Sequence, residues 1–147
     1  MVNGEVARRA EVCTALNQMN AGENDNGEGD DIESRLVDFA VSIVNLSDHM
    51  PNQRSANHIV GQLLRSGTAP AALYAEARGA ESPRDFQHKL KVCFKELNES
   101  RVWLKIVIKS KMVNPEKLSS LYQECDELCR IINASIKTSR TNQNRTG

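Results

Sequence analysis

From residue 31 onward, apolar residues recur every three or four positions, and this spacing is the strongest constraint on the fold. The first such stretch holds Ile32, Leu36, Phe39, Ile43, Leu46 and Met50. Pro51 ends it. A period near 3.6 places these side chains on one face of an α-helix. Because aromatic residues are only 4% of the chain, β-rich architectures are disfavoured. The pattern predicts an all-α protein.

The second stretch, residues 52–77, has a proline in its middle. Pro70 lacks the N–H that would bond the carbonyl of Ser66, at a cost of about 3 kcal/mol in an unsupported helix. Alanines stand on both sides of it, at positions 69, 71, 72, 75 and 77. We therefore expect a bent helix that continues past Pro70, rather than a catalytic loop.

Local signals mark the start of a third helix, which we expect over residues 83–111. Gly79 suits a left-handed position at the end of the second helix. Ser82 can accept a hydrogen bond from the N–H of Asp85, and Pro83 fits the first helical turn. The core stripe of this helix is predicted to contain Phe86, Leu90, Cys93, Leu97, Leu104 and Ile108.

The fourth helix begins with Asn114 as its cap and Pro115 as its first residue, and its apolar positions continue to Ile136. Four helices of about 20 to 30 residues joined by short turns describe an antiparallel up-and-down four-helix bundle. We assign residues 32–138 to this bundle and residues 139–147 to a polar tail.

The N-terminal segment differs in composition from the bundle. Residues 1–31 hold seven acidic residues against Arg8 and Arg9, a balance of minus five, which leaves plus five for residues 32–147, with 17 basic and 12 acidic. Residues 21–31, AGENDNGEGDD, have nothing to bury. We predict a flexible acidic leader, in which one face of a short helix would hold Val6, Ala10, Cys13 and Leu16.

The chain shows no targeting or membrane signal. No apolar run approaches the roughly 18 residues that span a bilayer, and the N-terminus lacks the hydrophobic centre of a signal peptide. The four cysteines lie in helix-like segments, without the dense framework of a small secreted domain. We expect a cytoplasmic protein.

Two cysteines have a spacing that permits metal ligation. Cys125 and Cys129 stand four residues apart on one helix face, but no histidine motif accompanies them. We favour small core cysteines, together with Cys93, and expect no metal and no cofactor.

The third helix carries a second apolar set, Val92, Trp103 and Ile106, on a different side from its core stripe. A helix of a monomeric bundle needs one buried stripe, so this set predicts an oligomer interface. The alternative to an oligomer interface is that this helix contacts the core over a wide face and leaves Trp103 partly exposed.

Basic residues of the third helix fall within a sector of about 80° at 100° per residue, with His88 at its edge. They are Arg84, Lys91, Lys95, Lys105 and Lys109. Such a row can follow a phosphate backbone, giving salt-dependent binding with little sequence information. Solvated lysines on an exposed face would produce the same pattern, so both interpretations stay open.

Four charged residues are candidates for internal pairing: Arg65, Glu76, Glu96 and Glu99. Charges that face a bundle interior or an interface need partners, because an unpaired buried charge is costly. Acid/base catalysis by paired carboxylates is the competing interpretation. We favour structural pairing, since no nucleophile, metal site or phosphate loop accompanies them.

Several segments resemble a known family. QLLRSGT at 62–68, AEARGAES at 75–82 and KELNESRVWL at 95–104 look like the four-helix bundle proteins encoded by intervening sequences of bacterial large-subunit ribosomal RNA genes. The resemblance covers residues 32–138 and implies a ring-shaped homopentamer without enzymatic activity. Relatives of that family include the accessory protein of diversity-generating retroelements, which binds a reverse transcriptase and nucleic acid. Ala69, Pro70 and Leu73 depart from the family pattern and replace a polar feature of the second helix.

The sequence therefore supports two hypotheses. The first is a non-enzymatic, oligomeric bundle that binds RNA or DNA through basic helix faces. The second is a protein-interaction scaffold or accessory subunit of a partner enzyme such as a reverse transcriptase.

Overall fold

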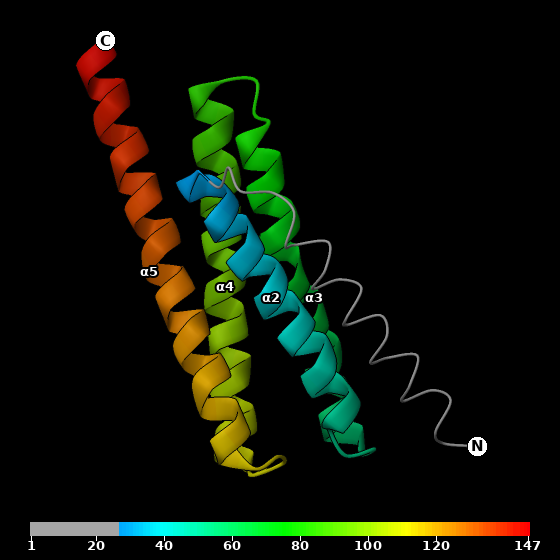
Figure 1. Cartoon of the computed structure of the whole chain (residues 1–147). Helices are drawn as coiled ribbons and strands as arrows, with labels where there is room; N and C mark the ends of the chain where they lie inside the picture. Colours follow the sequence, from blue (N-terminus) through cyan, green and yellow to red (C-terminus); the bar gives the residue numbers. More distant parts are fainter. Residues whose placement is uncertain (1–26) are drawn as a thin grey trace. The chain divides into compact units, whose positions relative to one another are not determined.

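The computed structural model describes residues 27–147, and its helices account for nearly all of them (Figure 1). They are α2 (Glu28–His49), α3 (Arg54–Arg78), α4 (Pro83–Ser110) and α5 (Pro115–Thr146). Within this described range there is no β-strand. The predicted all-α, up-and-down four-helix bundle is confirmed. The short helix expected within residues 6–16 lies outside the described residues.

The helix boundaries follow the predicted capping signals. The Ser82 hydroxyl accepts a hydrogen bond of 3.1 Å from the backbone N–H of Asp85. The Asn114 Oδ1 atom accepts one of 3.2 Å from the N–H of Glu116. Each bond satisfies a donor that the first turn of a helix leaves without a partner.

Two boundary expectations differ from the structure. Gly79 ends α3 with φ −94°, so it is not left-handed; its N–H instead returns to the carbonyl of Ala75. The left-handed residue of the described chain is Lys111, with φ 56°, at the end of α4. The polar tail also is helical, because α5 continues to Thr146.

Helix α3 continues through Pro70, as the flanking alanines predict. The proline is buried, and its carbonyl accepts a hydrogen bond of 3.5 Å from the Cys93 thiol of α4. Three residues before it, Gly67 lies against α2: a Cβ atom there would stand 2.7 Å from Cγ1 of Ile43. The missing side chain lets α2 and α3 approach closely at this point.

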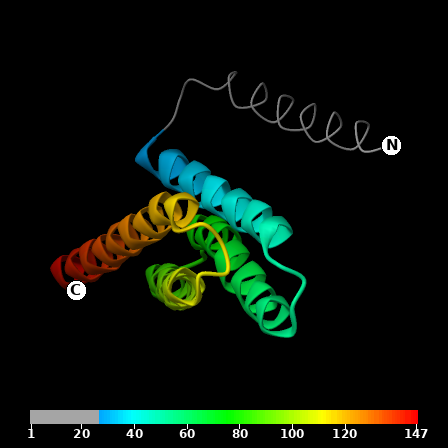
Figure 2. The same ribbon diagram turned by 90° about the horizontal axis from the view of Figure 1, so that it is seen from below.

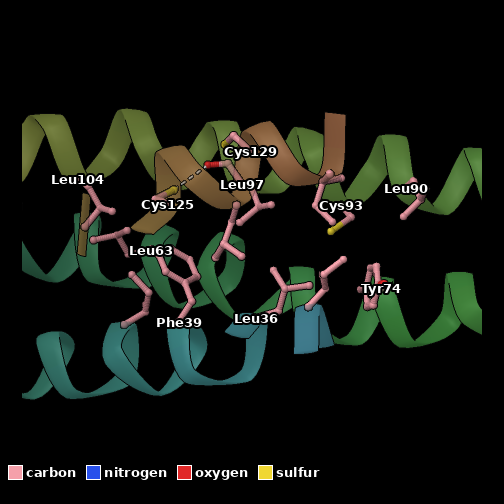
Figure 3. Close-up of a cluster of buried hydrophobic side chains, with 14 of the residues drawn as sticks. Leu36, Phe39, Leu63, Tyr74, Leu90, Cys93, Leu97, Leu104, Cys125 and Cys129 are labelled. Carbon is pink, nitrogen blue, oxygen red and sulfur yellow. Dashed lines mark hydrogen bonds between the residues drawn. The ribbon is translucent and has the colours of Figure 1, made fainter. Parts of the chain in front are cut away.

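The core runs along the centre of the bundle and draws on all four helices. Figure 3 shows part of it, with Leu36 and Phe39 of α2 facing Leu97 and neighbouring side chains of α4. Of the core stripe predicted for α4, the residues that are fully buried are Leu90, Cys93, Leu97 and Leu104. Phe86 and Ile108 are only partly buried, whereas Val107 joins the buried set. In Figure 2, α4 is seen close to end-on, with α3 on one side and α5 on the other.

Candidate nucleic-acid interface

The five basic residues predicted to bind nucleic acid lie on α4, and all of them are exposed, as is His88. They occupy the outer side of the helix because Leu90, Leu97 and Leu104 hold its opposite side in the core. Within residues 27–147, none of the five forms a salt bridge. The Lys105 ammonium lies 5.9 Å from the centre of the Tyr122 ring on α5.

Basic residues elsewhere in the bundle are mostly paired. The nitrogen–oxygen distances are 3.0 Å for Arg35–Glu124, 3.1 Å for Arg78–Glu33, 2.9 Å for Lys89–Glu76 and 3.2 Å for Arg101–Asp126. These pairs join neighbouring helices and neutralise their own charge. The outer face of α4 therefore carries a row of positive charge that the described residues leave largely uncompensated.

Three of the four residues predicted to pair come together between α3 and α4. The Arg65 guanidinium bonds Glu96 at 3.0 Å and also bonds Glu99. The Glu99 hydrogen bond raises the pKa of Arg65, and the same bond lowers the pKa of Glu99. Trp103 adds a donor, since its Nε1–H lies 3.4 Å from the Glu99 carboxylate. Glu76 is elsewhere, paired with Lys89.

A buried hydroxyl pair lies beside this cluster. The Ser100 Oγ stands 2.9 Å from the Ser66 Oγ and 3.0 Å from the carbonyl oxygen of Glu96, and both serines are fully buried. No buried side-chain nitrogen or oxygen in the described chain lacks a partner. Sequence reasoning missed this pair, because two serines 34 positions apart carry no local signal of contact.

The pair gives a prediction about stability. Ser100→Ala leaves the buried Ser66 hydroxyl without its partner, so we expect a loss of about 1–3 kcal/mol in the free energy of unfolding. Replacing both serines by alanine removes the donor and the acceptor together, and it should cost less than the sum of the two single changes. Urea denaturation of the three variants measures this. Additive losses in the double variant would show that the two hydroxyls contribute independently, and a loss larger than the sum would also contradict the prediction.

The three apolar residues of α4 predicted to form an oligomer interface do not all lie on one surface. Trp103 packs partly against the core and meets His58 edge-on, with ring centres 5.9 Å apart. Ile106 is 39% exposed. Both line a surface groove of about 680 Å³ with residues of α3, namely Arg54, Ser55, His58 and Ile59. Val92 is partly buried and does not line this groove.

A second exposed apolar row, on α2, was not predicted. Val37, Val41 and Val44 are 46%, 44% and 42% exposed. Their spacing of four and three residues places them on one face of α2, opposite the core face. The same period that identified the core could have revealed this row. Val102 of α4, at 53% exposure, was missed as well.

The cysteines of the bundle are core residues. Cys93, Cys125 and Cys129 are free and buried (Figure 3). The Cys125 thiol donates to the carbonyl of Leu97 at 3.3 Å. Burial raises the pKa of the Cys93 thiol to about 12, so this thiol stays protonated near neutral pH. The described residues contain no group of three or more histidine, cysteine or acidic side chains able to hold a metal ion.

A hollow lies between α2 and α5. It measures about 560 Å³, and Phe39, Leu46 and Leu118 are among the apolar residues that line it. Arg35 of α2 and Glu124 of α5 lie in its wall and bond each other through two hydrogen bonds of 3.0 Å.

Over residues 27–147, no helix is both long and apolar enough to cross a bilayer.

The fold and surface define a class: up-and-down four-helix bundles with a basic outer helix face. The chain belongs to the 23S rRNA-intervening sequence protein family, whose family model matches residues 31–134. The predicted resemblance is thereby confirmed, whereas the relation to retroelement accessory proteins stays a prediction.

A solved structure supports the assignment. The chain is similar to a protein of unknown function from the S23 ribosomal protein family of Bacteroides thetaiotaomicron VPI-5482. The two share 33% sequence identity over 72% of this chain and 98% of that protein, with a TM-score of 0.68. None of the curated proteins matches the chain significantly.

Proposed function

We propose that this protein is a non-enzymatic, oligomeric helical bundle that binds nucleic acid through the outer face of α4. One observation carries the proposal: Arg84, Lys91, Lys95, Lys105 and Lys109 are exposed on that face without a salt bridge inside the described bundle, whereas six other cations of the described chain are paired. A row of exposed cations along one helix can follow the repeating charge of a phosphate backbone.

This mode of binding predicts a strong dependence on salt. Each cation that neutralises a phosphate releases a counterion, so five contacts give a slope of about −4 to −5 in log affinity against log salt for a duplex. Binding of the full-length protein to RNA and DNA can be followed by fluorescence anisotropy over a salt series. Absence of binding at about 50 mM salt, where such contacts are strong, would refute the proposal.

Self-association is the second part of the proposal, and it rests on exposed apolar surface. Ile106 and Trp103 share a groove on one side of the bundle, and the valine row of α2 offers another apolar strip. Exposed apolar rows of this kind mark protein contacts more often than plain surface. Five copies in a ring is the arrangement that the family resemblance implies, and the second apolar set of α4, Val92, Trp103 and Ile106, is the contact that we propose.

The variant Ile106→Glu tests this contact. A carboxylate placed in an apolar interface is costly to desolvate, so we expect the oligomer to dissociate towards monomer in light scattering. Trp103→Ala is a poorer probe than the sequence implies, because Trp103 also packs against the core. Lys111→Glu, at an exposed position outside the groove, is the control and should leave the mass unchanged. A monomeric wild-type protein would contradict the proposal.

An accessory subunit that docks a partner enzyme, such as a reverse transcriptase, is the second candidate. The valine row of α2 favours it, because this strip lies on a different helix from the basic row. An oligomer that binds no nucleic acid at low salt would point to this function instead.

The buried free thiols fit the reducing cytoplasm, where we place the protein.

A further inference from the structure

We propose that the bound nucleic acid is double-stranded and lies along the seam between α4 and α5, with Lys137 and Arg140 of α5 facing the basic row of α4. This inference rests on the proposed function and adds a second row of contacts and a class of ligand. It starts from the helical tail, whose cations Lys137, Arg140 and Arg145 the sequence leaves open as an extension of the basic patch or as solvated charges.

One side-chain hydrogen bond ties the tail of α5 to the beginning of α4. The Gln87 side chain, which is buried, donates a hydrogen bond of 2.7 Å to the side-chain oxygen of Gln143. Because the tail is helical up to Thr146, its cations have fixed positions relative to α4. Arg84 lies one turn before Gln87 and therefore stands at this same end of the seam.

The register between the two antiparallel helices places their cations at matching levels. Arg101 of α4 meets Asp126 of α5, and Lys105 meets Tyr122, so each step of four residues towards the start of α4 matches four residues towards the end of α5. Continued into the tail, this register sets Lys137 about level with Lys91, and Arg140 between the levels of Arg84 and Lys91. The cations of the two helices therefore stand across the seam from one another.

Lys137 and Arg140 also lie on the side of α5 that faces α4. At 100° per residue they are about 60° apart, and Arg140 falls on the same side as Tyr122 and about 40° from Asp126. Tyr122 and Asp126 contact Lys105 and Arg101 of α4, so this side of α5 faces α4. Both cations are exposed.

The charge balance of this end of α5 is one-sided. Glu127 is the last acidic residue of the chain, and the residues after it include Arg130, Lys137, Arg140 and Arg145. Arg130 is paired with Asp126, at 2.7 Å. Lys137 and Arg140 form no salt bridge with any described residue. A second row of uncompensated charge therefore borders the seam.

Two features favour a duplex over a single strand. Packed helices lie about 8–10 Å apart, so two phosphate backbones separated by a groove of about 6–12 Å can each meet one row of cations. Proteins that hold single strands stack the bases on aromatic side chains. Every aromatic residue in the described chain is buried or partly buried: Phe39, Tyr74, Phe86, Phe94, Trp103 and Tyr122. The seam therefore offers two rows of cations to phosphate backbones, and Tyr122 beside it is partly buried with the Lys105 ammonium over its ring.

The test uses the full-length protein and four probes of about 20 nucleotides per strand, namely RNA duplex, DNA duplex and the matching single strands. We expect each duplex to bind at least about tenfold more tightly than its single strands, with little change on altering the sequence. RNA and DNA duplexes share the phosphate chemistry, and comparing them identifies which one is preferred.

The paired variant Lys137→Gln with Arg140→Gln probes the second row. Losing two phosphate contacts should lower the salt slope by about 2 and weaken duplex binding at low salt by roughly a hundredfold. Arg54→Gln with Arg145→Gln is the charge-matched control, since Arg54 is on α3 and Arg145 lies about 80° around α5 from Lys137. Circular dichroism of each variant verifies that the helices are retained.

The outcomes separate this inference from the proposed function. An unchanged salt slope in the Lys137/Arg140 variant, or single strands that bind as tightly as duplexes, would overturn the inference and leave binding by α4 in place. A wild-type protein that binds none of the four probes would overturn the proposed function itself.

Discussion

Replacing Lys91, Lys95 and Lys109 together by glutamine is expected to weaken duplex binding about a thousandfold at roughly 50 mM salt and to lower the salt slope by about 3. The three side chains are exposed and form no salt bridge in the described bundle, so their removal breaks no internal contact that would unfold the protein. Lys105 is retained because its ammonium contacts the Tyr122 ring. Anisotropy titrations at several salt concentrations measure both quantities.

The control for this variant removes the same charge from other surfaces. Arg54, Lys111 and Arg145 are exposed and lie off the α4 row, so their joint change to glutamine should reduce affinity only slightly. If both triple variants weaken binding equally, net charge rather than the α4 face controls the affinity. That result would count against a defined site.

A glycine pair within α3 should respond to alanine with opposite signs. Gly67→Ala brings a Cβ atom to 2.7 Å from Cγ1, 3.0 Å from Cγ2 and 3.2 Å from Cβ of Ile43. Rotating Ile43 does not relieve the clash, because both branches and the Cβ atom are involved and the residue is fully buried. We expect a net loss of about 1–3 kcal/mol in the free energy of unfolding, as in other overpacked cores.

Gly61→Ala is the matched control in the same helix. Nothing lies within 4 Å of a Cβ atom at that position. Alanine should therefore stabilise the protein by about 0.5–1 kcal/mol, since glycine in a helix interior is unfavourable. Thermal or urea denaturation of the two variants measures both changes in the free energy of unfolding. A stabilising effect at both positions would show that α2 and α3 can separate at Gly67 without cost.

The sequence predicted the helices well because the signals for them are local. Ser82 and Asn114 each cap a helix by accepting a hydrogen bond from a backbone N–H only two or three residues away. The residues next to each helix start were therefore enough to predict it. The continuation of the helix past Pro70 was also predicted correctly, since the alanines around it favour helix. Gly79 was misjudged: glycine permits a left-handed conformation, but the structure does not use it there.

The candidate site was only partly visible in the sequence. The basic row of α4 follows from helical period alone, because all its members lie on one helix. Which cations are neutralised does not follow, since Arg101 finds Asp126 on α5 and Lys89 finds Glu76 on α3. The sequence names Lys137 and Arg140 as cations that could extend this row, but their place beside α4 became apparent only when the Gln87–Gln143 bond tied the tail to α4.

The sequence by itself determined the four helices of the described residues, most of their ends and the face that each buries, because these depend on contacts within a few residues and on the 3.6-residue period. Only the tertiary structure decided which charged side chains pair with each other. It also decided that Ile43 of α2 packs against Gly67 of α3, and that two rows of cations border the seam between α4 and α5. Such relations join residues far apart in the chain, and their geometry depends on how whole helices pack.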